Sequence, residues 1–128
     1  MNAFTQRDPA RTYARNETAS VCGRVAEGRA FVEAARMLDR VLKAPTDTAE
    51  RRRALTFNRI LWTALQADVS GPGSPLPAAM RARLLSLSLY VDRALLALGL
   101  SRDTEPLEAL IEINRNIAAG LLASSDPA

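Results

Sequence analysis

The side chains best suited to catalysis are scarce in this sequence. Its 128 residues include no His and one Cys, Cys22. His is the commonest general base and the commonest metal ligand, so most catalytic and metal-binding arrangements cannot be assembled without it. The sequence also lacks a nucleophile elbow, a Walker loop and a dinucleotide fingerprint. We therefore predict a protein without enzymatic activity, cofactor or metal, in which Cys22 is a small, semi-buried side chain that forms no internal disulfide.

Carboxylates are the remaining candidates for a metal site. Glu105, Glu108 and Glu112 would lie near one face of a helix and could hold a hard cation. A solvated acidic face near a helix N-terminus explains the same residues more simply, because the helix dipole favours negative charge there. The acidic residues therefore carry no prediction of a metal.

Basic residues are concentrated in the first half of the chain. Residues 1–60 contain 12 Arg or Lys and 7 Asp or Glu, whereas residues 61–128 contain 5 and 7. The triplet Arg51, Arg52 and Arg53 could contact RNA phosphates. However, no aromatic residues are interleaved to stack on bases, so ordinary solvated helix surface is the favoured interpretation. RNA contact is kept as the alternative.

Three residues on helical stripes are candidates for contact with a partner. Asn58 and Asn114 each interrupt an apolar stripe, and a buried amide without a partner costs about 1–3 kcal/mol. They either bond to backbone carbonyls between helices or meet polar backbone supplied by a partner. Trp62 is expected to be a core residue, or an interface anchor if it is exposed.

The composition and the apolar periodicity predict an all-α protein. Hydrophobic residues make up 48% of the chain and aromatic residues only 5%, so the apolar content is mostly the strong helix formers Leu and Ala. Gly23 and Gly28 lie where a helix could break, and Gly99 is expected to follow the end of a helix. The expected helices are a weak one over 9–20 and clearer ones over 24–44, 47–69, 77–98 and 106–121.

Short loops between these segments predict a single domain over 1–128, folded as a small bundle of four to five helices. Residues 1–22 are expected to be loosely ordered or a weak first helix, and residues 124–128 a frayed tail. The segment 77–98 is apolar over most of its circumference, which predicts a central, enclosed helix. No signal peptide and no apolar stretch of about 18 residues is present, so we expect a cytoplasmic protein without membrane contact.

Two segments carry a resemblance to a known family. Residues 55–63 (L-T-F-N-R-I-L-W-T) and 110–121 resemble stretches of the FlaF family of alphaproteobacterial flagellar biosynthesis proteins, as do residues 76–81 and 85–91. The run I-N-x-N-I-A-x-G-L over 113–121 is the most specific piece. The resemblance covers about residues 30–122. Residues 20–27 depart from the element that usually opens the family's second helix.

The resemblance implies a cytoplasmic regulator of flagellin synthesis and export. Members of the family associate with flagellin before secretion, as a chaperone or regulator, and act alongside FlbT. A chaperone of this kind needs an apolar surface that receives an amphipathic client helix. The alternatives are a regulator that contacts flagellin mRNA through the basic N-terminal half and a structural subunit that pairs with FlbT or with itself. The expected partner-binding residues are Asn58, Trp62, Leu85, Leu89, Asn114 and Arg115.

Overall fold

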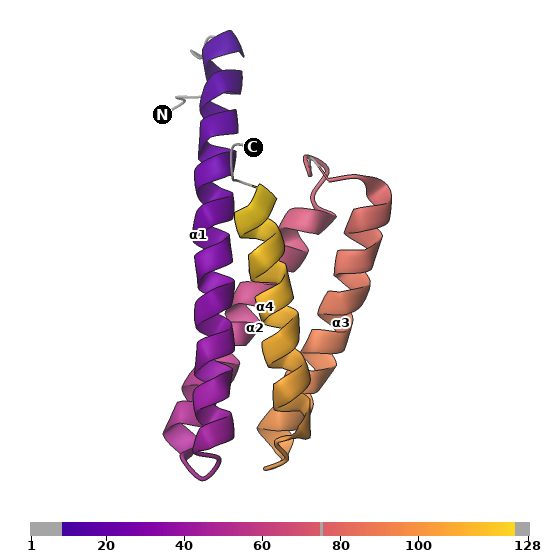
Figure 1. Cartoon of the computed structure of the whole chain (residues 1–128). Coiled ribbons are helices and arrows are strands. Elements are labelled where there is room, and N and C mark those ends of the chain that lie inside the picture. The colour runs from indigo at the N-terminus through magenta and orange to yellow at the C-terminus, as the bar shows by residue number, and fades with distance from the viewer. Residues whose placement is uncertain (1–8, 75, 125–128) are drawn as a thin grey trace, which may run out of the picture.

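The computed structural model describes residues 9–74 and 76–124, with side chains described at residue 23, at 25–74 and at 76–123. Every regular element in this part of the chain is an α-helix (Figure 1). The prediction of an all-α bundle is therefore confirmed, with four helices in place of four to five. They are α1 (Pro9–Lys43), α2 (Thr48–Ser70), α3 (Ala78–Leu100) and α4 (Glu105–Ser124).

The helices run alternately down and up, as expected where short loops join neighbours (Figure 1). α1 packs against α4 along the most extensive interface, and α2 packs against both α1 and α3. The interface between α3 and α4 is much the smallest of the four. α1 has 35 residues and α4 has 20, so α1 is the longer helix by about 22 Å at 1.5 Å per residue.

The first helix is continuous, so the break that the sequence left open at Gly23 or Gly28 does not occur. Gly28 is buried inside α1, and a Cβ added there would lie 2.7 Å from Cγ of Leu122 on α4. The glycine therefore permits close approach of two helices and ends neither of them. The expectations for residues 1–8, for residues 125–128 and for the Cys22 side chain fall outside the described residues.

The helix ends follow the sequence signals only in part. Asp47 and Glu50 have the spacing of a capping box in the sequence, and Asp47 caps α2, because its Oδ1 accepts a hydrogen bond of 3.0 Å from the Glu50 N–H. At the end of α3, Gly99 remains inside the helix, which contradicts its expected role after the last turn. The helix continues to Leu100 and is followed by Ser101 in an extended conformation, with its N–H bonded to the Ala97 carbonyl.

The core lies where α1, α2 and α4 meet. On α2 the buried stripe is centred on Asn58 and Trp62, whereas Ala64 on the same helix is exposed. α3 is not the enclosed helix that its apolar circumference predicted, because it packs mainly on α2 and leaves several large apolar side chains in solvent. The principal buried apolar residues are Phe31, Ala35, Leu38, Val41, Trp62, Val91, Leu98, Leu107 and Leu110.

Candidate functional site

The six residues expected to contact a partner fall into two groups. Asn58, Trp62 and Asn114 are buried at the centre of the bundle. Leu85 is half-buried and Leu89 is exposed, both on α3, and Arg115 is exposed on α4.

The buried group forms a continuous chain of hydrogen bonds across three helices. Nε1 of Trp62 donates to Oδ1 of Asn114 at 2.9 Å, and Nδ2 of Asn114 donates to Oδ1 of Asn58 at 2.7 Å. Nδ2 of Asn58 then donates to the carbonyls of Ala54, at 2.9 Å, and Ala34, at 3.3 Å. The chain thus passes from α2 to α4, back to α2, and on to α1.

This arrangement gives the two amides and the indole their partners within the bundle. Asn58 bonds to backbone carbonyls, as one of the two interpretations expected, while Asn114 bonds to side chains. The Phe31 ring meets the Trp62 ring edge-on, with centroids 5.4 Å apart and planes at 85°. These residues hold α1, α2 and α4 in register, and a partner would reach them only if the helices separated.

The arginine triplet does not form one basic surface. Arg51 is buried, which contradicts the expectation of solvated helix surface. Its guanidinium donates to the carbonyls of Leu98, Ser101 and Asp103 at 2.9–3.1 Å. A cation at these carbonyls is favoured because the C-terminal end of a helix carries partial negative charge.

The other two arginines of the triplet are exposed. Arg53 lies 2.6 Å from Glu50 in an ion pair, whereas Arg52 extends from the same turn. Glu50 neutralises part of the charge that remains, so the case for phosphate contact rests on fewer groups than the sequence suggested.

The most prominent apolar surface lies on the side of α3 that faces away from the core. We call it the α3 ridge and define it as Leu85, Leu89, Arg93, Leu96 and Leu100. The exposed fractions of Leu89, Leu96 and Leu100 are 57%, 65% and 80%. Their spacing of seven and four residues puts them on one side of the helix.

The residues expected to contact a partner included Leu85 and Leu89 but not Leu96 and Leu100. The signal was available, because a helix that is apolar all round either is enclosed or presents a surface to a partner. The sequence predicted an enclosed helix, whereas the structure leaves these leucines exposed.

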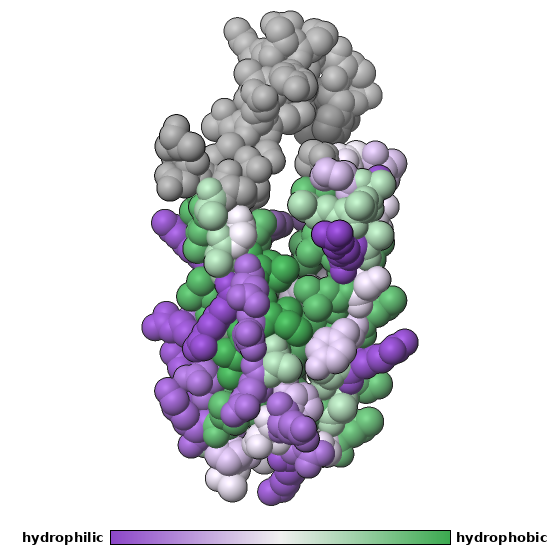
Figure 2. Space-filling model, turned by 45° about the vertical axis from the view of Figure 1, so that its right-hand side comes forward, coloured by the Kyte–Doolittle hydropathy of each residue, from purple (hydrophilic) through white to green (hydrophobic). Residues whose placement is uncertain are grey.

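A second apolar surface lies where α3 and α4 diverge. The space-filling view shows a green band down the middle of this face, between a more charged left-hand column and a right-hand column with further apolar residues (Figure 2). Few contacts join the two helices here, so their facing side chains are only half-buried. Those packed against the core include Leu84 and Leu87 of α3 and Ile113 and Ile117 of α4.

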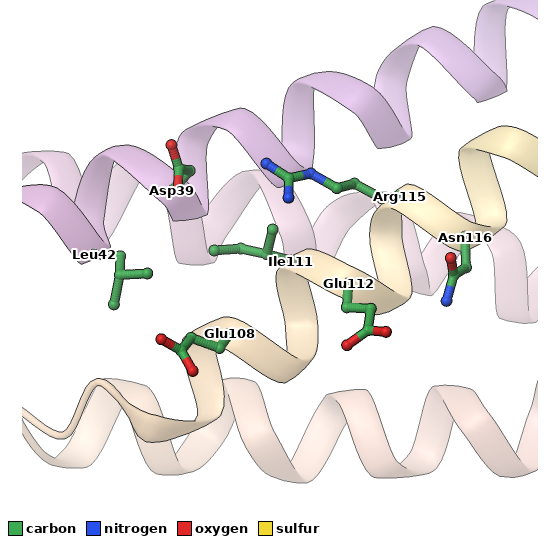
Figure 3. Close-up of a pocket in the computed structure, with 7 residues that line it drawn as sticks. All are labelled: Asp39, Leu42, Glu108, Ile111, Glu112, Arg115 and Asn116. Atoms are coloured by element: carbon green, nitrogen blue, oxygen red, sulfur yellow. The ribbon is translucent and has the colours of Figure 1, made fainter.

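A shallow hollow of about 330 Å³ lies on the other side of α4, between α4 and α1. Its lining mixes apolar residues with charged ones, including Asp39, Glu112 and Arg115 (Figure 3). The Lys43 ammonium, 2.8 Å from the Asp39 carboxylate, lowers the pKa of Asp39, and the charge of Arg115 adds to this effect. Arg115 therefore lies on a different side of the bundle from Leu85 and Leu89.

Among the described residues, no three acidic or Cys side chains are grouped so that they could hold a metal ion. Glu105 and Glu108 lie in the first turn of α4, where the dipole interpretation expected them. No helix within 9–74 or 76–124 is both long and apolar enough to span a membrane.

Comparison with known proteins agrees with the resemblance seen in the sequence. The family model for the flagellar protein FlaF matches residues 9–121. The match begins with the first residue of α1, so it also covers residues 9–29, which the resemblance did not include. No curated protein and no solved structure matches the chain.

Proposed function

The chain belongs to the FlaF flagellar protein family, and from this premise we propose that it binds flagellin before secretion, as an export chaperone in the cytoplasm. Its client would dock on the α3 ridge. Flagellin held in this way would not assemble prematurely. The amount of chaperone free of flagellin would in turn control flagellin synthesis. FlbT is the expected second partner. The proposal requires no catalytic group, and FlaF is not a known enzyme family.

The α3 ridge is the observation that carries this proposal. Leu89, Leu96 and Leu100 are each more than half exposed on one side of one helix. Burying a leucine that was exposed contributes about 1.5–3 kcal/mol. A row of such residues therefore favours a partner that covers them together, whereas a single exposed leucine needs no explanation.

The shape of the ridge favours a helical client. Residues 85–100 span four turns of helix, about 22 Å at 1.5 Å per residue. A client helix with apolar residues at spacings of three and four could cover this row along its length.

The proposal is tested by co-purification of flagellin with variants of the ridge. We expect the double variant Leu89→Asp, Leu96→Asp to lose flagellin, because each carboxylate would have to be desolvated at the interface. Ile60→Asp is the matched control, since Ile60 is also 65% exposed but lies on α2, outside the ridge. Circular dichroism and thermal unfolding should show all three proteins folded.

Two outcomes would count against the proposal. Undiminished capture of flagellin by the folded double variant would exclude the ridge as the docking site. Equal loss in the Ile60→Asp control would show that the effect is not specific to α3. Titration with flagellin leader RNA at two salt concentrations tests the alternative, for which tight, sequence-specific and strongly salt-dependent binding would be required.

A further inference from the structure

We propose that Arg93 selects the client of the α3 ridge by charge, so that the docked segment is an amphipathic helix whose apolar stripe is interrupted by an Asp or Glu. This inference rests on the docking surface of the proposed function and adds the chemistry of the partner.

Arg93 occupies the middle of the ridge. It lies four residues after Leu89 and three before Leu96, on the same exposed side of α3. It is the only charged member of the ridge, and no ion pair joins it to another described residue. A helix that covers the leucines must therefore also cover the Arg93 guanidinium.

The neighbouring carboxylate does not neutralise this charge. Asp92 is the only acidic residue of α3, and its Oδ2 accepts a hydrogen bond of 2.8 Å from Nε2 of Gln66 on α2. This bond directs Asp92 toward α2, away from the ridge. Covering Arg93 with an apolar side chain would leave a desolvated cation without a partner, whereas a carboxylate would pair with it.

A second copy of the chain fits this surface poorly. Pairing two ridges so that their leucines overlap best brings Arg93 close to Arg93 of the other copy, whether the helices are parallel or antiparallel. The outer surface of α4 has the required carboxylates, Glu105, Glu108 and Glu112, but no accompanying row of exposed leucines. The ridge therefore favours a different protein, which combines both features in one helix.

A central charge of this kind acts mainly on specificity. Clients with a carboxylate opposite Arg93 gain a pair shielded from water, and helices with only apolar residues or with a cation are penalised there. The leucines would supply affinity for many amphipathic helices, and Arg93 would choose among them.

The test is a binding titration of purified monomeric flagellin against folded variants at position 93. We expect Arg93→Glu to weaken binding about tenfold or more, and Arg93→Lys to weaken it by less than about threefold, because a charge at the centre of an interface matters most through its sign. Arg59→Glu is the matched control, since Arg59 is exposed on α2 and should leave affinity unchanged. A flagellin in which one Asp or Glu of the segment that docks on the ridge is changed to Arg should restore binding to Arg93→Glu.

The outcomes separate this inference from the proposed function. Loss of binding in Leu89→Asp, Leu96→Asp together with unchanged binding in Arg93→Glu would overturn the role of Arg93 and leave the ridge as the docking site. If neither change affects binding, the ridge itself is excluded. If no charge-reversed flagellin restores binding to Arg93→Glu, the carboxylate partner is rejected.

Discussion

The two sides of α4 differ in how they are packed and in what they expose. Toward α1 the helix forms the largest interface of the molecule, with Gly28 against Leu122, and toward α2 the buried Asn114 amide is hydrogen-bonded to Trp62 and Asn58. Toward α3, contacts are few and apolar side chains stay half-buried. The molecule thus buries amides on one side of α4 and leaves apolar side chains half-buried on the other, next to a helix whose outer side exposes leucines.

This difference assigns separate tasks to the two regions. A chain of buried, satisfied amides fixes how helices are aligned, because a shifted helix would leave them without partners. The α3 ridge has no such constraint and can be covered by another helix. We expect changes among the buried amides and Trp62 to alter stability and changes on the ridge to alter binding.

The largest effect should come from Trp62→Ala. Removing a fully buried indole leaves a cavity and deprives Asn114 of its donor, so we expect a loss of about 3–5 kcal/mol in the free energy of unfolding. Denaturant unfolding measures this change. Leu96→Asp on the ridge is the control, and we expect it to change the free energy of unfolding by less than about 0.5 kcal/mol. Equal losses in the two variants would contradict the distinction between the two regions.

The pair of amides, Asn58 and Asn114, provides a sharper test of the buried hydrogen bonds. Asn114→Ala should cost about 2–3 kcal/mol, because it leaves Trp62 Nε1 and Asn58 Oδ1 without their hydrogen-bond partners. The double variant Asn58→Ala, Asn114→Ala should cost less than the two single changes added together, by about 1 kcal/mol or more. Additive losses in this double-mutant cycle would show that the two amides act independently.

Arg51 tests how firmly α3 is held at its end. Arg51→Met keeps an apolar stem but removes the donors to Leu98, Ser101 and Asp103, and we expect a loss of about 2 kcal/mol. The neighbouring Arg52→Met is the control and should change stability by less than about 0.5 kcal/mol. Equal losses of stability in the two variants would show that the buried hydrogen bonds of Arg51 do not stabilise the fold.

The smallest effect concerns a contact between carboxylates of α1 and α2. Burial raises the pKa of Glu27, and a hydrogen bond and charge from Asp68 raise it further. Because the pKa of Glu27 is raised in the folded state, protonated Glu27 stabilises the folded protein at low pH. This contribution to stability is lost as pH rises through the folded-state pKa. Glu27→Gln should therefore raise the melting temperature slightly at about pH 7 but not at about pH 4, where Glu27 is mostly protonated. A pH-independent effect of Glu27→Gln would contradict the assignment.

Much of the fold could be predicted from local sequence. Apolar periodicity located α2, α3 and α4 to within a few residues, and Asp47 marked the start of α2, because these signals depend on near neighbours. Gly28 was misread since its role depends on Leu122, far along the chain. The sequence around a helical glycine looks the same whether the glycine weakens its helix or allows a second helix to pack closely against it.

The candidate site was less predictable for the same reason. Asn58 and Asn114 were recognised as unusual on an apolar stripe, but their mutual bond depends on how α2 and α4 face each other. Arg51, Arg52 and Arg53 have the same side chain, and only the position of the α3 terminus distinguishes the buried one. For the ridge, the sequence showed the excess of leucines and could not show which of them the other helices would leave uncovered.

The buried guanidinium of Arg51 has a consequence for the order of folding. Its bonds join residues up to 52 positions apart, so they form only after α3 has returned to the start of α2. Until then, burying the charge would be unfavourable, and Arg51 would stay hydrated. We therefore expect the first turn of α2 to complete its packing late, when the turn between α3 and α4 closes over it.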